Sequence, residues 1–199
     1  AIMIVSYSFF KVLQKELGVE SNHFKNFAGH SLGEYSALVC SNSLSFKDAL
    51  FLLDERGKAM QNAVPIGKGG MIAVLGSDIK TLESLVNKLD KNGVCEIAND
   101  NSVGQIIVSG DIKSINSFKK LLDDTKIKNI PLPVSAPFHC SLMQKASKDM
   151  EEKINSIKFL NPEIPIVANV TAKEEIDSDT IKNLLVKQIF SKVRWRESM

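Results

Sequence analysis

The chain has few of the residues that would commit it to a disulfide framework, a metal site or a membrane. It has three cysteines in 199 residues, Cys40, Cys95 and Cys140. Three widely spaced cysteines exclude a dense disulfide framework, match no zinc-ligand spacing and are typical of a reducing cytosol. No apolar run reaches the ~18 residues that span a bilayer. We therefore expect a cytoplasmic protein with no membrane partner.

A strong charge of either sign is also lacking. Lys and Arg number 25 and Asp and Glu number 23, which leaves a formal net charge of +2. With no long basic run, this balance argues against a dedicated nucleic-acid-binding protein. The hydrophobic content of 44% is ordinary for a soluble globular protein. The length predicts one large domain, or one domain that carries a smaller one.

The first 17 residues predict a helix. Their apolar residues recur at helical spacing, and Leu17-Gly18 is typical of a helix C-terminus. The segment lacks the basic region and the small-residue cleavage site of a signal peptide. Because the helix starts without a capping residue, we expect further sequence to precede it.

The middle of the chain predicts strands and helices in the order βαββαβ. The predicted strands are 71–75, 94–98, 105–109 and 127–134, and the predicted helices are 78–89 and 111–122. This order is that of the split βαβ, or ferredoxin-like, unit. The two ends of such a unit return to one place, as an inserted domain requires. We predict that residues 69–133 are this insertion, joined to the rest by a flexible GKGG segment at 67–70.

The flanking segments predict alternating strands and helices. The predicted strands are 24–28 and 164–169. One predicted helix starts at Ser31, and the others are 45–63, 141–157 and 178–190. Strands that alternate with helices favour a parallel sheet. The sequence therefore predicts an α/β core made of residues 1–68 and 134–199.

Gly29, Ser31 and Gly33 form a G-x-S-x-G pattern within NFAGHSLGEYSALVC. In a nucleophile elbow, the chain turns sharply from strand to helix, and side chains two before and two after the serine would collide. A second interpretation is a capping box, in which Ser31 and Glu34 start a helix. Capping does not explain glycine at both 29 and 33.

A nucleophilic serine needs a base, and histidine suits this role best. His30 is adjacent to Ser31, so its side chain is expected to point elsewhere, and His23 lies at the amino end of the predicted strand 24–28. His139 remains, on the loop that leaves the predicted insertion. Because a lone histidine is more often structural, both interpretations of His139 stay open from the residues alone.

The predicted helix 45–63 carries an arginine within its apolar stripe. The stripe consists of Ala49, Leu53, Arg56, Met60 and Ala63. A guanidinium in such a place must find an anion. One interpretation is an ion pair with Glu34 or Glu55, or a side chain that reaches out to the rim. The other is a fork for a substrate carboxylate.

Seven segments resemble, in collinear order, the malonyl-CoA:acyl-carrier-protein transacylases. They are GHSLGEYSA, DERGKAMQ, GGMIAVLG, IANDNSVGQIIVSG, PFHCSLM, IVANVTA and KQIFSKVRW. These acyltransferases load the carrier for fatty-acid synthesis and are related to the acyltransferase domains of polyketide synthases. The resemblance covers nearly the whole chain. It implies an α/β-hydrolase-like parallel-sheet core with a ferredoxin-like insertion.

The resemblance also implies roles for individual residues. Ser31 resembles the nucleophile that carries the acyl group, and His139 resembles its general base and later acid. Arg56 resembles the clamp on the malonyl carboxylate. The main-chain carbonyl of Gln188 resembles the group that orients the histidine, and the Leu32 N–H resembles half of the oxyanion hole. The APFH at 136–139 is similar to the signature of malonyl-type enzymes.

The implied substrates are malonyl-CoA and an acyl carrier protein with its phosphopantetheine arm, with no metal or redox cofactor. Asn169 is expected near the site, with no assigned role. The family's N-terminal strand and Gln-Gly-Ser-Gln-like loop, which supplies a second oxyanion contact, have no match here, nor does its segment after VRW. The resemblance therefore implies a fragment of an enzyme that is a monomer when complete.

Two other functions remain possible at this point. A serine esterase or thioesterase would carry its serine, acid and histidine in that chain order, and Asp100 or Asp111 would supply the acid. Both aspartates fall inside the predicted insertion. The third possibility is a weakly active fragment that only binds coenzyme A or the carrier.

Overall fold

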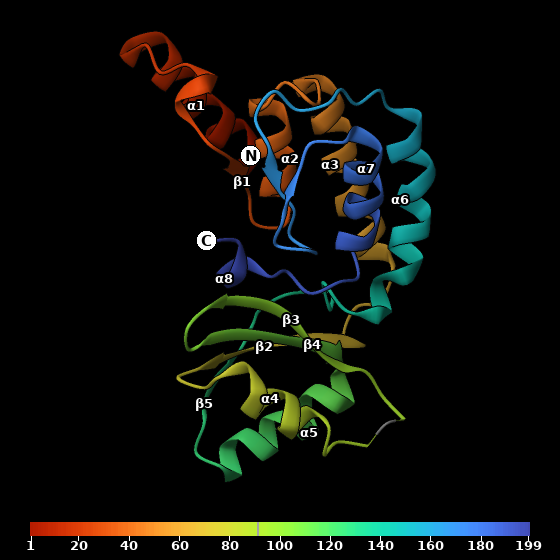
Figure 1. Ribbon diagram of the computed structural model, residues 1–199. Coiled ribbons are helices and arrows are strands. Elements are labelled where there is room, and N and C mark those ends of the chain that lie inside the picture. The colour runs from red at the N-terminus through yellow and green to blue at the C-terminus, as the bar shows by residue number, and fades with distance from the viewer. Residues whose placement is uncertain (91) are drawn as a thin grey trace.

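A computed structural model describes residues 1–90 and 92–199; Lys91, inside the predicted insertion 69–133, lies outside the described residues. Figure 1 shows two parts, a mostly helical one and one built on a larger sheet. No helix in the described residues has both the length and the apolar character needed to cross a membrane.

The helical part is formed by both ends of the chain. Its helices are α1 (Ile2–Leu17), α2 (Gly33–Cys40), α3 (Phe46–Asn62), α6 (Gln144–Ser156), α7 (Ser178–Gln188) and α8 (Trp195–Ser198), with short 3-10 turns at Ser21–His23 and Ser141–Met143. Its strands are β1 (Phe27–Ala28), β6 (Ile166–Val167) and β7 (Glu174–Glu175). The strands pair in the order β1-β6-β7, with β1 parallel to β6 and β7 antiparallel to β6.

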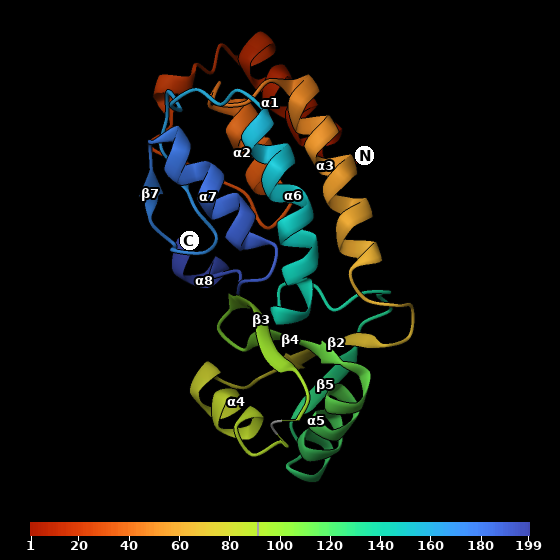
Figure 2. The same ribbon diagram turned by 90° about the vertical axis from the view of Figure 1, so that its right-hand side faces the viewer.

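Helices α3, α6 and α7 pack beside one another along one side of this part (Figure 2). Their apolar faces share one core with α2, in which the side chains of Leu38, Leu52, Ile154 and Leu185 are fully buried. Burial of each such side chain stabilises the fold by roughly 1.5–3 kcal/mol relative to leaving it exposed. This core fixes the positions at which α2, α3 and α7 present residues to the site described below.

The other part is a four-stranded antiparallel sheet with two helices. Its elements are β2 (Gly69–Leu75), α4 (Ile79–Val86), β3 (Cys95–Ser102), β4 (Gln105–Asp111), α5 (Ile112–Asp124) and β5 (Lys128–Pro131). The strand order is β3-β4-β2-β5, and every neighbouring pair is antiparallel. The predicted element order βαββαβ is therefore confirmed.

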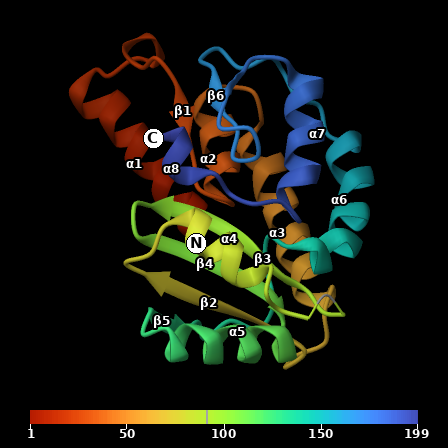
Figure 3. The same ribbon diagram turned by 60° about the horizontal axis from the view of Figure 1, so that its bottom comes forward.

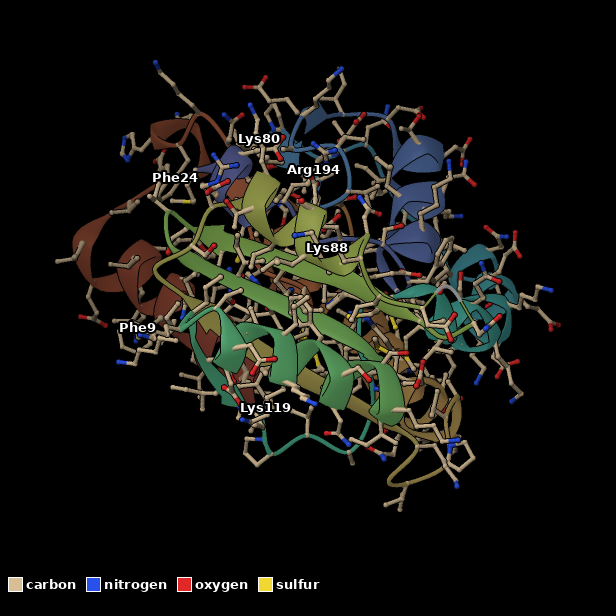
Figure 4. The ribbon with its side chains drawn as sticks, turned by 90° about the horizontal axis from the view of Figure 1, so that it is seen from below. Phe9, Phe24, Lys80, Lys88, Lys119 and Arg194 are labelled. Carbon is tan, nitrogen blue, oxygen red and sulfur yellow. The ribbon has the colours of Figure 1, made fainter. Side chains whose placement is uncertain are left out.

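The two faces of this sheet have different partners, because side chains alternate along a strand. Ile72 and Val74 of β2 pack under α4 and α5, whereas Met71 and Ala73 belong to a second cluster that contacts Phe138. Figure 3 shows α4 and α5 across the first face. Seen from that side, Figure 4 has α4 and α5 in front of the strands.

Several predicted element boundaries are confirmed and others are wrong. Helix α1 ends at Leu17 and is capped by Gly18, which has a left-handed φ of 62°. Ser45 caps α3 by accepting from the Asp48 N–H. The strand predicted over 24–28 is only two residues long. The flexible segment predicted at 67–70 is wrong in its second half, because Gly69 and Gly70 are buried residues of β2.

The last residues of the chain were not predicted to form structure, yet they join the two parts. Val193 pairs in parallel with Asn99, and hydrogen bonds link its N–H to the Ala98 carbonyl and its carbonyl to the Asp100 N–H, both at 2.9 Å. Arg196 then forms an ion pair with Asp100, with a shortest N–O distance of 2.7 Å. Helix α8 therefore contacts β3 and lies between the parts (Figure 1).

Candidate active site

Ser31 stands in the sharp turn that connects β1 to α2. Its φ is 52°, in the left-handed region that non-glycine residues seldom occupy. A Cβ added at Gly29 would lie 1.9 Å from the Gly33 carbonyl oxygen, so the turn needs glycine there. A Cβ at Gly33 would meet nothing within 4 Å. The predicted collision is confirmed for Gly29 and wrong for Gly33.

The capping-box interpretation of Ser31 and Glu34 is wrong. Helix α2 begins at Gly33, with Leu32 in the cap position and no side-chain cap. A capping residue usually has an extended backbone, which the left-handed Ser31 does not have. Glu34 is buried, and its Oε2 accepts from the Asn169 N–H at 3.1 Å and from Gln188 Nε2 at 2.8 Å.

His139 faces Ser31 from the loop before α6. Its Nε2 lies 2.8 Å from Ser31 Oγ, and its Nδ1 lies 2.9 Å from the main-chain carbonyl oxygen of Gln188. Because a carbonyl only accepts hydrogen bonds, this contact puts the ring proton on Nδ1 and the lone pair on Nε2. Burial, followed by the charge of Arg56, lowers the pKa of His139 from 6.5 to about 3. The imidazole is thus neutral at physiological pH.

The other two histidines lie away from the serine hydroxyl, as predicted. His30 Nε2 is 2.8 Å from Asn101 Oδ1 on β3, and its ring packs edge-on against Trp195. His23 lies in the 3-10 turn before β1, where its Nδ1 accepts from the Glu20 N–H. His139 is the histidine that the fold brings to Ser31.

Arg56 reaches the same point from α3. It is 6% exposed, and its Nη2 donates to Ser31 Oγ at 3.1 Å and to Gln188 Oε1 at 3.0 Å. Its Nε is buried without a hydrogen-bond partner among the described residues. Burial lowers the pKa of the guanidinium, and nearby Tyr35 and Glu34 oppose that shift.

The ion pair considered for Arg56 is not formed with either carboxylate. Glu55 turns instead to Lys58 and Lys153. Glu34 holds Gln188 and Asn169, so the amide of Gln188 stands between Glu34 and Arg56. Because neither carboxylate pairs with it, the buried guanidinium of Arg56 can still bind an anion.

The remaining candidates also meet at the turn. Within the described residues no hydrogen bond uses the Leu32 N–H, which follows Ser31 at the amino end of α2. Asn169, expected near the site without a role, bridges two backbone groups of the turn. Its Oδ1 accepts from the Ser31 N–H at 2.7 Å, and its Nδ2 donates to the Gly29 carbonyl at 2.8 Å. The side chain of Gln188 donates to the Ser31 carbonyl at 3.0 Å.

The aspartates considered for a hydrolase triad are engaged elsewhere. Asp100 is bound by two nitrogens of Arg196, and Asp111 caps α5 by accepting from the Ser114 N–H. The place where such a triad has its carboxylate is taken by the carbonyl of Gln188. Among residues 1–90 and 92–199, His, Cys, Asp and Glu side chains form no group of three that could hold a metal ion.

A serine in a strained strand-to-helix turn, facing a neutral histidine, is the arrangement of enzymes that form an acyl-serine. The comparisons with known proteins agree with this class. The chain belongs to the acyl transferase domain family, whose model matches residues 1–199.

The relatives found by sequence are malonyl CoA-acyl carrier protein transacylases. That of Bacillus subtilis is 40% identical over 174 residues, which cover 86% of this chain and 55% of the relative. That of Escherichia coli K12 is 36% identical over 200 residues, which cover 100% of this chain and 64% of the relative. The chain thus spans between about half and two thirds of the length of these relatives.

Solved structures of similar proteins have the same fold. The acyl-carrier-protein-S-malonyltransferase from Bartonella henselae superposes with a TM-score of 0.94 at 40% identity, covering 98% of this chain and 63% of its own. A malonyl-transacylase in complex with a type II polyketide synthase acyl-carrier protein gives a TM-score of 0.93 at 35% identity, covering 98% and 62%. Both likenesses run through nearly all of the present chain.

Proposed function

We propose that this protein, as part of the complete enzyme, transfers a malonyl group from malonyl-CoA to the phosphopantetheine thiol of an acyl carrier protein. The observation that carries the proposal is that Ser31 Oγ lies 2.8 Å from His139 Nε2 and 3.1 Å from Arg56 Nη2. A hydroxyl, an imidazole nitrogen and a guanidinium thus meet at one point, which supports their roles as nucleophile, base and carboxylate-binding cation. The names of the relatives support malonyl-CoA and a carrier protein as the substrates.

In the first half of the reaction, Ser31 Oγ attacks the thioester carbonyl while His139 Nε2 takes the hydroxyl proton. The tetrahedral intermediate collapses, the C–S bond breaks, and the histidine returns the proton to the coenzyme A thiolate. A malonyl-serine ester remains. In the second half, the carrier's thiol gives its proton to His139 and attacks the ester carbonyl. The bond between this carbon and Ser31 Oγ then breaks, and the histidine returns the proton to Ser31 Oγ.

The oxyanion is proposed to accept a hydrogen bond from the Leu32 N–H, at the amino end of α2. The positive end of the helix dipole favours negative charge at this place. One such donor is typically worth ~3–4 kcal/mol of transition-state stabilisation. The second donor is assigned to no residue of this chain.

Arg56 is proposed to bind the free carboxylate of the malonyl group. Among the described residues, Arg56 donates hydrogen bonds only to neutral groups, the Ser31 hydroxyl and the Gln188 amide. A substrate carboxylate would supply the anion that the buried guanidinium lacks. This role makes the site selective for carboxylated acyl groups over acetyl.

We also propose that residues 1–68 and 134–199 form an α/β-hydrolase-like core and that residues 69–133 form a ferredoxin-like insertion. The antiparallel order β3-β4-β2-β5 supports the second assignment, and the parallel pair β1 and β6 supports the first. We further propose that the enzyme is cytoplasmic, is a monomer when complete, and needs no cofactor beyond its two substrates.

The test is to mix the full-length protein with malonyl-CoA, measure its intact mass, and then add purified carrier protein. We expect one malonyl group on wild-type protein, none on Ser31→Ala, and loss of the adduct to the carrier. An adduct that persists on Ser31→Ala would place the nucleophile elsewhere. Release of free malonate without loading of the carrier would indicate a thioesterase, and binding without an adduct would indicate a carrier- or coenzyme-binding protein.

A further inference from the structure

We propose that Glu34 is a positioning residue for the nucleophile: through Gln188 and Asn169, its carboxyl oxygen holds Ser31 in the strained backbone conformation that the transfer needs. This inference rests on the proposed function for its chemistry, and on the hydrogen bonds of the turn for its geometry. Glu34 touches neither Ser31 Oγ nor His139, so its effect is indirect.

The conformation of Ser31 needs an external restraint. A non-glycine residue in the left-handed region costs on the order of 1–3 kcal/mol, which the surroundings must supply. At Ser31 they do so from both sides: Asn169 Oδ1 accepts from its N–H, and Gln188 Nε2 donates to its carbonyl. Asn169 Nδ2 also donates to the Gly29 carbonyl, so this side chain links the two ends of the turn.

Asn169 and Gln188, which restrain Ser31, both donate hydrogen bonds to the same oxygen of Glu34. Glu34 Oε2 accepts from Gln188 Nε2 at 2.8 Å and from the main-chain N–H of Asn169 at 3.1 Å. Gln188 ends α7 and Asn169 follows β6, so Glu34 fixes two segments that approach the turn from different directions. Without this acceptor, the Asn169 N–H would lose its partner, and the Gln188 amide would keep only its contacts to Arg56 and to the Ser31 carbonyl.

To hold Asn169 and Gln188, residue 34 must place an acceptor oxygen at the distance that a glutamate side chain spans. The charge of that side chain matters less. Burial is the main cause that raises the pKa of Glu34 to about 7, against the hydrogen bonds from Gln188 and Asn169 and the charge of Arg56. The carboxyl therefore changes protonation near neutral pH, and the protonated form still offers one carbonyl oxygen to both donors. A glutamine has the same length and the same carbonyl oxygen, whereas an aspartate has the charge and is one methylene too short.

The experiment compares Glu34→Gln with Glu34→Asp in the full-length protein, and Ser36→Ala is the matched control. Ser36 lies on the same helix and is buried, and its Oγ has no hydrogen-bond partner among the described residues. Malonyl transfer gives kcat and KM. The rate at which a neutral sulfonyl fluoride labels Ser31 reports the nucleophile without any contact between Arg56 and a substrate carboxylate.

We expect Glu34→Gln and Ser36→Ala to stay within about threefold of wild type in kcat and in labelling rate. Glu34→Asp should lose roughly 10- to 100-fold in both rates, with KM little changed. This range corresponds to the free energy of leaving a buried donor unsatisfied. Assays run below each variant's unfolding midpoint, so that only folded protein is compared. A wild-type rate in Glu34→Asp would overturn the inference. So would a Glu34→Gln variant as slow as Glu34→Asp, or a loss confined to malonyl transfer without slower labelling.

Failure of the proposed function has a different signature. In that case, wild-type protein takes up no malonyl group, while the sulfonyl fluoride still labels Ser31 in wild type and Glu34→Gln and labels Glu34→Asp slowly. This result would support the role of Glu34 and remove malonyl transfer as the activity.

Discussion

His139 and Gln188 are joined through a hydrogen bond of 2.9 Å from ring Nδ1 to a main-chain carbonyl, at the position where a serine triad has a carboxylate. The carbonyl selects the tautomer that leaves Nε2 basic, as a carboxylate would. It brings no full negative charge, however, so it stabilises the imidazolium less. Burial, followed by the charge of Arg56, lowers the pKa of His139, and the hydrogen bond to the Gln188 carbonyl opposes this shift without cancelling it.

The pH profile of the first half-reaction should reflect this lowered pKa. A base with a pKa of about 3, in place of 6.5, stays neutral as the pH falls through 6 and 5. We therefore expect kcat/KM for malonyl-CoA, which reports the free enzyme, to stay flat from pH 8 to about 5. Labelling of Ser31 by a neutral sulfonyl fluoride should follow the same curve. A half-maximal rate between pH 6 and 7 would show that His139 titrates normally.

Loss of the His139 imidazole should slow acylation strongly. We expect His139→Ala to lower the rate by ~10²–10⁴, the usual contribution of a positioned acid–base group. His30→Ala is the control, because His30 is bound to Asn101 and does not face Ser31 Oγ. Single-turnover formation of the malonyl-serine measures both variants. A near-wild-type rate for His139→Ala would make this histidine structural.

Replacement of Arg56 should distinguish between acyl groups. Arg56→Ala removes the charged hydrogen bonds that we propose to the malonyl carboxylate. Each is worth roughly 1.5–3 kcal/mol, so malonyl transfer should fall by ~10- to 150-fold per bond. Acetyl transfer should change far less, because acetyl has no carboxylate. Both are measured as kcat/KM on protein shown to be folded by its unfolding midpoint. Equal losses for the two acyl groups would instead assign Arg56 to the fold.

Elements with many regularly spaced apolar residues were predictable. The stripe of α3 is an example: Ala49, Arg56 and Met60 are indeed buried on one face, and the Ser45 cap is where the sequence places it. The two-residue strands β1 and β6 show the opposite case. Such strands are too short for a period to be read, and their pairing joins residues about 139 positions apart.

The same distinction applies to the candidate site. Ser31 and His139 were reached from a local motif and by elimination, and the fold brings them together. The role of Glu34 was missed because a three-residue spacing also suits a capping box, while its real partners, Asn169 and Gln188, are 135 and 154 residues away. A carboxylate directly before the apolar run of α2 was the one local sign that this side chain would be buried.

The two glycines of the G-x-S-x-G pattern should differ in their tolerance of alanine. At Gly29 the added Cβ would lie 1.9 Å from a backbone oxygen, and the turn would have to open. At Gly33, within α2, the Cβ meets nothing within 4 Å, and alanine is a better helix former than glycine by up to ~1 kcal/mol. We expect denaturant unfolding to show a large loss for Gly29→Ala and no loss for Gly33→Ala. Equal losses would refute the close approach.

The stability of wild-type protein relative to Glu34→Gln should depend on pH. The pKa of Glu34 is raised from 4.5 in the ordinary carboxyl to about 7 in the folded protein, so the folded state holds this proton more tightly than the unfolded state. The resulting stabilisation is fully present below pH 4.5 and is lost as the pH rises through 7. From pH 4.5 to 8, Glu34→Gln should therefore gain on wild type by on the order of 3 kcal/mol.

His139, whose pKa is lowered, acts in the opposite direction between about pH 3 and 6.5, but both proteins contain it and the difference isolates Glu34. Urea unfolding at several pH values measures this difference, and Ser36→Ala should show an offset that does not change with pH. A constant difference between wild type and Glu34→Gln from pH 4.5 to 8 would mean that Glu34 titrates alike in both states. Its carboxyl would then be ionised in the fold at neutral pH, and the raised pKa of Glu34 would be wrong.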